Sequence, residues 1–402
     1  MRQSEPPIVL FQDYRLCFLL VALILYATLS SPTPDNPSWV EVAIAGLLLG
    51  SLGASGFFQG LKNILSHKKT SSWNIAGYGL LCYGLIVPTL LALYHAVSFQ
   101  VFIRDIIAFG FLCVPIFLVP FLSHSTTRQN LFAKLIIFIG LAFALRVVFL
   151  DFSFFTKADE LLYLANSPLV LLAALYCVLC LGDKISNLKS LYDVKWLVIY
   201  GALALLPMLA MYIDFQRASF LAIGLAAFGF GGLMFFKTPV KTILPAGLLL
   251  ILLVMFLPYF QIVLESIVTK TSKVGLNMRY QEAMAVWSVV SYNPFSLLFG
   301  LGWGAEFSSP AVGMLNVGYT HSLLTYIFLK AGLIALGLTL FYLFFIFQKA
   351  IKLIFVNSVW GNALIWPLVI PVILYASYKS LDFGLIMTLI IVMDIKIKNK
   401  VS

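Results

Sequence analysis

The chain has 402 residues, of which 61% are hydrophobic and only 10% are charged. A soluble domain carries about 25% charged residues, so this chain cannot cover a water-facing surface. The mean hydropathy is +1.00, and apolar runs of about 18 residues or more, each long enough to cross a membrane, recur throughout. These runs lack the alternation of a transmembrane β-barrel. The composition therefore predicts an all-α, polytopic transmembrane bundle and excludes a soluble domain.

We expect one integral membrane domain over residues 1–402, built from about twelve spans. The first span is expected to be retained rather than cleaved, because no small-residue cleavage site follows it. The expected spans are residues 16–30, 40–58, 73–94, 101–122, 131–150, 161–181, 196–213, 218–236, 241–260, 321–347, 360–378 and 380–395.

The placement of the basic residues sets the orientation. The net charge is +10, and with both termini in the cytoplasm 17 of the 26 basic residues fall on the cytoplasmic side. Short outer connections such as residues 30–39 have none, as the positive-inside rule requires. Because topology accounts for most of the basic charge, we expect contact with membrane lipids and no nucleic-acid binding.

Several basic residues do not follow this rule. Four arginines lie near the outer ends of spans or in an outer loop, namely Arg104, Arg146, Arg217 and Arg279, and Lys330 lies within a span. Ionisable residues at membrane depth are functional candidates by default. The planar guanidinium binds phosphate oxygens in a bidentate manner. A cluster of these arginines would therefore suit a lipid-linked phosphate or diphosphate.

Two of the arginines have a competing structural interpretation. Asp105 follows Arg104, and Asp151 follows Arg146 five residues later. A local ion pair or an interfacial side chain explains each of them without a ligand. We favour the structural interpretation for both and keep them as secondary site candidates.

The other two cations are judged differently. Arg217 lies three residues after Asp214, so a salt bridge within the turn is possible, but we favour a functional role because little else links the two spans. Lys330 must find a partner, a wet cavity or the carbonyls of a neighbouring helix, and the sequence leaves these alternatives open.

The longest connection, residues 261–320, is expected outside the cell membrane as a lid over a site. Asn277 can cap a helix through MRYQEAMAVWSVVSY, in which Arg279 and Glu282 form a polar i,i+3 pair, and Asn293 and Pro294 end it. The pattern predicts an amphipathic helix at the outer surface. The glycines of FGLGWGAEF (299–307) permit unusual backbone angles or a close ligand approach, but their spacing is not that of a dinucleotide-binding loop.

His321 follows this loop at the start of the next span. Only four histidines exist in the chain, and the outer side offers too few convergent ligands for a metal site. A lone histidine is often a hydrogen-bonded interface residue. Histidine is also the natural proton acceptor at neutral pH, and the shared loop with Arg279 favours that role here.

The order of these features resembles the O-antigen ligase and O-antigen polymerase superfamily of bacterial envelope glycosyltransferases. The features are FQRASFLAIGL, then MRYQEAMAVW and NPF in a large outer loop, then FGLGWGAEF, then THSLLTYIFLKAGLIALGLTLFY. The resemblance is best over residues 205–345. It departs at Ser322, where the family commonly has asparagine.

The resemblance implies a metal-independent, inverting glycosyl transfer without a cofactor, at the periplasmic face of a bacterial inner membrane. Arg217 and Arg279 would bind the diphosphate of an undecaprenyl-diphosphate-linked glycan. His321 would act as general base on a hydroxyl of the acceptor. In a ligase the acceptor is a lipid A–core sugar, which we favour because the chain has one main outer loop.

Two alternatives stay open. In a polymerase of the same superfamily, the acceptor is the next repeat unit of the growing chain. A transporter or flippase for lipid-linked sugars would carry out no covalent chemistry, and Lys330 and Arg146 are the residues that favour it. Transporters usually have paired halves with matching interrupted helices, and the sequence has no such internal pairing.

Overall fold

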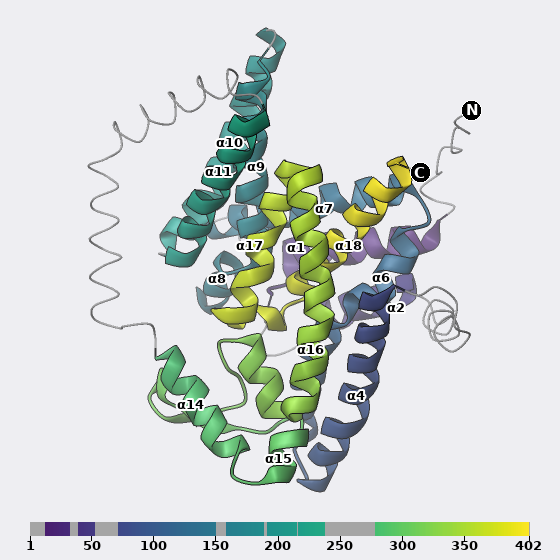
Figure 1. Ribbon diagram of the computed structural model, residues 1–402, viewed down its shortest axis with the longest axis vertical. Helices are drawn as coiled ribbons and strands as arrows, with labels where there is room; N and C mark the ends of the chain where they lie inside the picture. The colour runs from purple at the N-terminus through teal and green to yellow at the C-terminus, as the bar shows by residue number, and fades with distance from the viewer. Residues whose placement is uncertain are drawn as a thin grey trace.

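The computed structural model describes residues 13–32, 39–52, 71–149, 158–188, 191–214, 216–237 and 278–401, which are mostly helical (Figure 1). The helices are α1 (Tyr14–Leu29), α2 (Trp39–Leu52), α4 (Ser72–Tyr94), α5 (Phe99–Leu112), α6 (Val114–Leu122), α7 (Thr126–Val148), α8 (Ala158–Ala165), α9 (Pro168–Ser186), α10 (Leu191–Ile213), α11 (Arg217–Lys237), α14 (Arg279–Val290), α15 (Pro294–Phe299), α16 (Leu323–Val356), α17 (Ser358–Ile373) and α18 (Leu381–Val401). The strands β1 (Phe307–Ser309) and β2 (Leu315–Val317) and the 3₁₀ turns η3 (Pro310–Val312) and η4 (Ala376–Lys379) complete the described structure.

Within the described residues, seven helical segments are long and apolar enough to cross a membrane. The expected helical membrane architecture is thus supported, while the count of twelve spans is not established. The ninth expected span, 241–260, and the proposed cap Asn277 lie outside the described residues. Helices α5 and α6 together form one of these segments. The other six are α4, α7, α9, α10, α11 and α16.

Two expected spans are divided. The expected span 161–181 is wrong, because the chain breaks after α8 and a new helix begins at Pro168. The Ser167 hydroxyl caps α9 by accepting the Leu169 N–H at 3.1 Å, and proline is well suited to the first turn of a helix. The expected span 101–122 is interrupted at Cys113, two residues before Pro115.

The expected continuous span 321–347 is also corrected. Helix α16 begins at Leu323 and is interrupted at Gly332, whose backbone has φ 71° and ψ −169°. This region is open essentially to glycine alone. A Cβ at this position would lie 2.4 Å from the Leu298 carbonyl oxygen, so α15 packs directly on the break. Residues 323–331 therefore form a short helix that precedes the long arm of α16.

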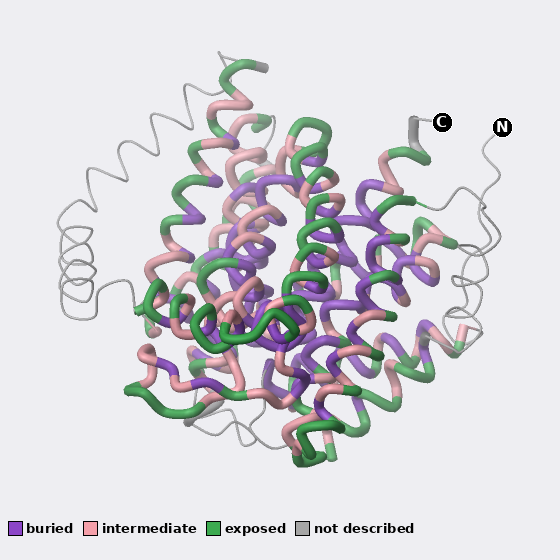
Figure 2. The backbone as a smooth tube through the Cα atoms, turned by 60° about the horizontal axis from the view of Figure 1, so that its bottom comes forward, coloured by how far each residue is buried: buried purple, intermediate pink, exposed green. Residues whose placement is uncertain are grey.

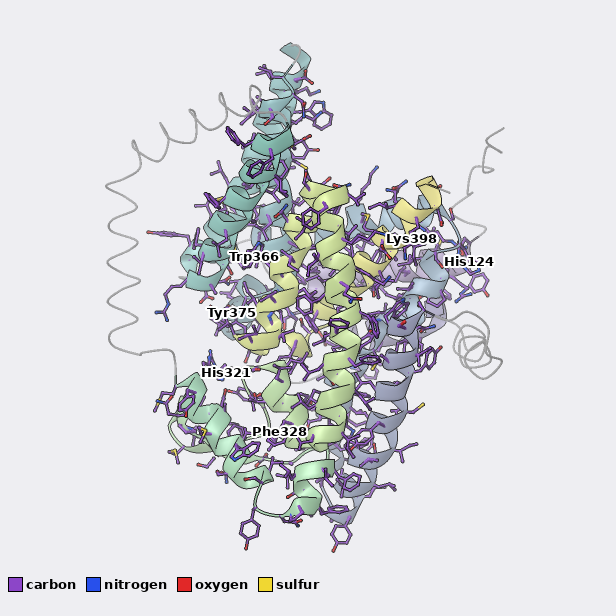
Figure 3. All side chains as sticks on the ribbon, viewed as in Figure 1. His124, His321, Phe328, Trp366, Tyr375 and Lys398 are labelled. Atoms are coloured by element: carbon purple, nitrogen blue, oxygen red, sulfur yellow. The ribbon has the colours of Figure 1, made fainter. Side chains whose placement is uncertain are left out.

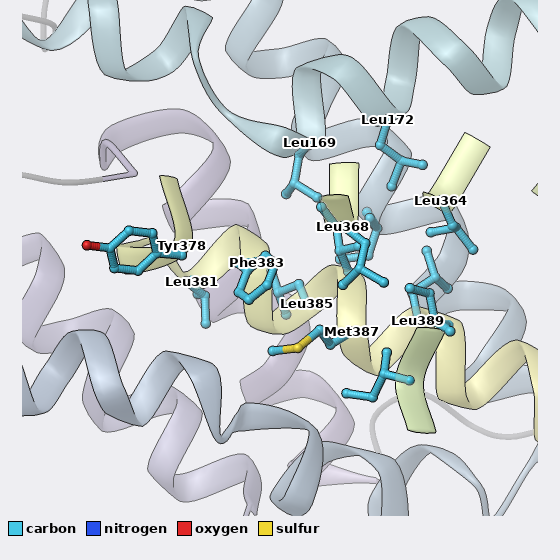
Figure 4. Close-up of a cluster of buried hydrophobic side chains, with 14 of the residues drawn as sticks. Leu169, Leu172, Leu364, Leu368, Tyr378, Leu381, Phe383, Leu385, Met387 and Leu389 are labelled. Carbon is cyan, nitrogen blue, oxygen red and sulfur yellow. The ribbon is translucent and has the colours of Figure 1, made fainter. Parts of the chain in front are cut away.

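The core of the bundle is built around α18 (Figure 4), which contacts α5, α6, α7, α9, α16 and α17. Each of residues 381–394 is buried. In Figure 2 the buried stretches of the chain lie in the middle of the bundle. Buried carboxylates need partners. Asp382 accepts hydrogen bonds from Tyr26 Oη at 2.7 Å and Ser167 Oγ at 2.6 Å. At the other end, Asp394 pairs with Lys349 at 2.7 Å.

The segment from α14 to β2 lies across one end of the bundle, at the bottom of Figure 1. The expected helix in the outer loop is present as α14. Its Val286 and Val290 pack with Phe307, Phe328 and Leu329, which fixes the helix against the short first part of α16. Strands β1 and β2 pair in an antiparallel manner. This packing sets the residues on the inner side of α14 against the start of α16.

Candidate functional site

The side chains of His321 and Glu282 meet where α14 faces the start of α16 (Figure 3). His321 Nδ1 lies 2.9 Å from Glu282 Oε1, and the backbone N–H of His321 donates to Glu282 Oε2 at 3.0 Å. Glu282 is only 2% exposed. The carboxyl group therefore fixes both the backbone and the ring of the histidine.

The residues on either side of His321 hold it in place. The Tyr378 hydroxyl donates to the Thr320 carbonyl oxygen at 2.9 Å. Ser322 is the N-cap of α16: its hydroxyl accepts the Leu324 N–H at 3.2 Å and donates to the Val372 carbonyl oxygen at 2.9 Å. The serine that departs from the family pattern thus serves as a helix cap. The histidine sits on a rigid turn tied to α17 and η4.

The hydrogen bonds around Glu282 define which ring nitrogen of His321 can act. Glu282 accepts from the His321 N–H and from Ser309 Oγ, which lies 3.2 Å from Oε1. An ionised carboxylate has only acceptors, so a neutral His321 ring beside it carries its proton on Nδ1 and keeps the lone pair on Nε2. Burial raises the pKa of the Glu282 carboxyl, and Arg279, Ser309 and Lys379 oppose that rise. The arrangement presents Nε2 as a proton acceptor.

Arg279 opens α14, one helical turn before Glu282. Its Nη1 is buried and has no hydrogen-bond partner within the described ranges. Burial lowers the pKa of the guanidinium, and the nearby Glu282, Tyr375 and Tyr319 oppose that shift. A buried donor without an acceptor is costly. The side chain is therefore placed to receive an anionic acceptor beside the histidine.

Arg217 opens α11 on the same end of the bundle. Arg217, Arg279 and Asp214 are all close enough to the Tyr375 hydroxyl for their charges to act on it. Tyr375 lies between α17 and η4. Tyr375 also lines a small recess whose surface is mostly apolar, with Asn166, Gln216 and Ser219 among its polar residues.

Lys330 belongs to a different cluster from that of His321 and Glu282. It is fully buried, and its Nζ lies 2.6 Å from Asp105 Oδ2. The same carboxylate accepts the Gly304 N–H at 2.6 Å and the Tyr326 hydroxyl at 3.1 Å. This buried pair joins α5 and α16 to the turn of residues 300–304, which we call the glycine turn. Lys330 therefore has a structural partner. Asp105 pairs with Lys330 rather than with its neighbour Arg104.

The glycine turn supplies a hydrogen bond that is missing from α4. Pro88 has no N–H for the Gly84 carbonyl oxygen, and Trp303 Nε1 donates to that oxygen at 2.9 Å. The Trp303 N–H donates to the Pro88 carbonyl oxygen at 3.2 Å. Gly300, Gly302 and Gly304 have φ angles of 79°, 92° and 85°, so they adopt the unusual backbone angles expected from the sequence as one possible use of these glycines.

The two secondary arginines lie in different settings. Arg146 Nη1 donates to the Ala27 and Ser30 carbonyl oxygens at 3.2 and 2.6 Å, and so caps the end of α1. This role is structural, but it is not the expected ion pair with Asp151, which lies outside the described residues. Arg104 is exposed, and its charge acts on the nearby Lys330 and Lys379.

Sequence reasoning missed two members of the site. Glu282 appears in the sequence as a helical partner of Arg279, and nothing local indicates its contact with a histidine 39 residues away. Lys379 appears as one more basic residue in a turn. In the structure its Nζ lies 4.4 Å from the centre of the Tyr319 ring, and the Tyr319 ring in turn contacts that of His321.

In the described part of the chain, no group of three or more His, Cys, Asp or Glu side chains is placed to hold a metal ion. Comparison of the chain with known protein families, with curated proteins and with solved structures found no match.

Proposed function

We propose that this protein is a membrane glycosyltransferase that moves a glycan from an undecaprenyl-diphosphate donor to a hydroxyl group, as an O-antigen ligase does. The observation that carries the proposal is the His321–Glu282 pair beside Arg279, whose buried Nη1 lacks a partner among the described residues. A base and an anion-binding group side by side are what this transfer requires. In this proposal the site faces the periplasm of a bacterial inner membrane.

The proposed reaction begins with an acceptor hydroxyl near His321. As its oxygen bonds to the anomeric carbon, the proton passes to His321 Nε2, and Glu282 stabilises the imidazolium through Nδ1. The bond from the anomeric carbon to the phosphate oxygen breaks, and its electrons leave on the diphosphate. Attack opposite the leaving group inverts the anomeric centre.

Arg279 and Arg217 act on the charge that develops on the departing diphosphate. Preorganised cations are most effective where charge appears in the transition state. Arg279 is partly buried and its Nη1 is withdrawn from water, so the interaction of that nitrogen with an anion is less screened than at an open surface.

The acceptor distinguishes two forms of the proposal. A lipid A–core sugar makes the protein a ligase, which the sequence favours, and a lipid-linked repeat unit makes it a polymerase. Both residues that favoured the transporter alternative have structural partners, because Lys330 pairs with Asp105 and Arg146 donates to carbonyl oxygens at the end of α1.

The test uses purified protein with a labelled undecaprenyl-diphosphate glycan and rough lipopolysaccharide. Label on the lipopolysaccharide indicates a ligase, and a ladder of lipid-linked repeats indicates a polymerase. His321→Ala should abolish either product, whereas His124→Ala, between α6 and α7, should not. Counterflow of donor lipid without any product would overturn the proposal in favour of transport.

A further inference from the structure

We propose that Lys379 is a third cation of the diphosphate site and takes up a proton when the anion binds. This inference rests on the proposed function and names a residue beyond the two arginines and the histidine. Lys379 is the last residue of η4, the turn between α17 and α18.

The first support is the position of its ammonium group. Lys379 Nζ lies 4.4 Å from the centre of the Tyr319 ring and 5.5 Å from that of Tyr326. Across the described residues, no side chain or carbonyl accepts a hydrogen bond from Nζ. The aromatic faces hold the cation while all three of its N–H donors stay available to a ligand.

The second support is convergence with Arg279. The charge of Glu282 acts on both Arg279 and Lys379. Tyr319 also acts on Arg279, and its ring lies under Lys379 Nζ and against His321. These contacts place Lys379 Nζ and the His321 ring on the same side chain, Tyr319. In this proposal a diphosphate bound at Arg279 extends to Lys379.

The third support is the balance of charge around the amine. Lys379 is influenced by Asp105 and Arg104 of α5, Lys330 of α16 and Glu282 of α14. The pKa of Lys379 falls to about 7 as the net result: burial lowers it most, Lys330 and Arg104 lower it as well, and the two carboxylates oppose the fall. Near neutral pH the amine is only partly charged. An anion favours the charged form, so binding draws a proton onto Lys379.

This coupling has a simple consequence. At pH 8 an amine with a pKa of about 7 is about nine-tenths neutral. Anion binding at pH 8 should then take up about 0.9 proton at Lys379, and binding at pH 6 should take up almost none there. Lys379→Arg keeps a permanent charge, so it should bind the anion without this uptake.

The experiment is calorimetric titration of the purified full-length protein in buffers of different ionisation enthalpy. Inorganic diphosphate and undecaprenyl diphosphate are titrated separately, which distinguishes a site for any diphosphate from one that needs the lipid. The proton count of Lys379→Arg is subtracted from that of the wild type, since this removes proton changes on the ligand. Lys379→Gln should weaken binding on the order of 10-fold or more.

An excess uptake of about 0.9 proton in the wild type at pH 8, absent at pH 6, supports the inference. Equal uptake in wild type and Lys379→Arg, with diphosphate bound, overturns it and leaves the proposed function intact. No binding of either diphosphate overturns both. Linked uptake without any glycosyl transfer leaves Lys379 as an anion ligand and overturns only the proposed function.

Discussion

The Nδ1 atom of His321 lies 2.9 Å from Oε1 of Glu282, across 39 residues of sequence. The same carboxyl group accepts the backbone N–H of His321 at 3.0 Å. One buried acid thus fixes the position and the ring orientation of one histidine, and in its ionised form it favours the tautomer with the proton on Nδ1. This contact makes Nε2 the reactive nitrogen in the proposed transfer.

Glu282→Gln tests this relationship. The amide keeps the size of the side chain but removes the charge that stabilises the imidazolium, so transfer should fall on the order of 10²–10⁴-fold. The initial rate of glycan transfer measures the effect, with circular dichroism to confirm the fold. Ser309→Ala removes only one of the hydrogen bonds to Glu282 and should cost less than about 10-fold. A Glu282→Gln enzyme with the wild-type rate contradicts the assigned role.

Arg279→Ala should lower transfer on the order of 10²–10³-fold, by analogy with the loss of one preorganised donor to a developing anion. Arg279→Lys should recover only part of the rate, because an ammonium cannot offer the planar fork of a guanidinium. Lys352→Ala, at the other end of α16 and half exposed, serves as the control. Full transfer by Arg279→Ala would refute the diphosphate contact.

Lys330→Met should affect stability more than chemistry. It leaves Asp105 buried without its cation, and breaking a buried pair in this way costs about 3–5 kcal/mol. Thermal unfolding in detergent should show a large loss, and the Lys330→Met, Asp105→Asn double variant should recover part of it. If the single variant unfolds like the wild type, the pair does not hold the glycine turn in place.

Gly332→Ala and Gly337→Ala form a matched pair in α16. Position 332 has φ 71° and no room for a Cβ, whereas position 337 has nothing within 4 Å of one. The first substitution should destabilise the protein on the order of 3 kcal/mol, and the second should be neutral or stabilise it by up to about 1 kcal/mol. Equal melting temperatures for the two variants would argue against the interrupted helix.

The lowered pKa of Lys379 predicts that the stability of the protein depends on pH. Because its pKa falls to about 7 on folding, mainly through burial, the unfolded chain binds more protons than the folded one between about pH 7 and pH 10.5. Stability from this group therefore rises with pH across that window. The melting temperature of the wild type minus that of Lys379→Met should increase from pH 7 to pH 9.5. A constant difference would place the amine in water.

The helices were predictable because hydropathy is local. Apolar runs locate α4, α7 and α11 to within a few residues, whereas the break at Gly332 depends on contact with α15, which no local pattern contains. The divided span at Ser167 and Pro168 carried a readable cap signal that the long apolar run concealed.

The site was predictable only in part. Arg217, Arg279 and His321 could be selected as titratable groups at an apolar boundary. Their partners could not, because Glu282 meets His321 and Asp105 meets Lys330 through the tertiary fold. The ion pair expected between the neighbours Arg104 and Asp105 is an example. The Asp105 carboxylate pairs instead with Lys330, which is 225 residues away.

The most direct test of the account is a structure of the protein with undecaprenyl diphosphate bound. The account predicts a phosphate oxygen within about 3 Å of Arg279 Nη1, with His321 Nε2 facing the space beside the diphosphate and the contact from Nδ1 to Glu282 preserved. A head group bound at the Lys349–Asp394 end of the bundle, with Arg279 Nη1 still lacking an acceptor, would contradict it.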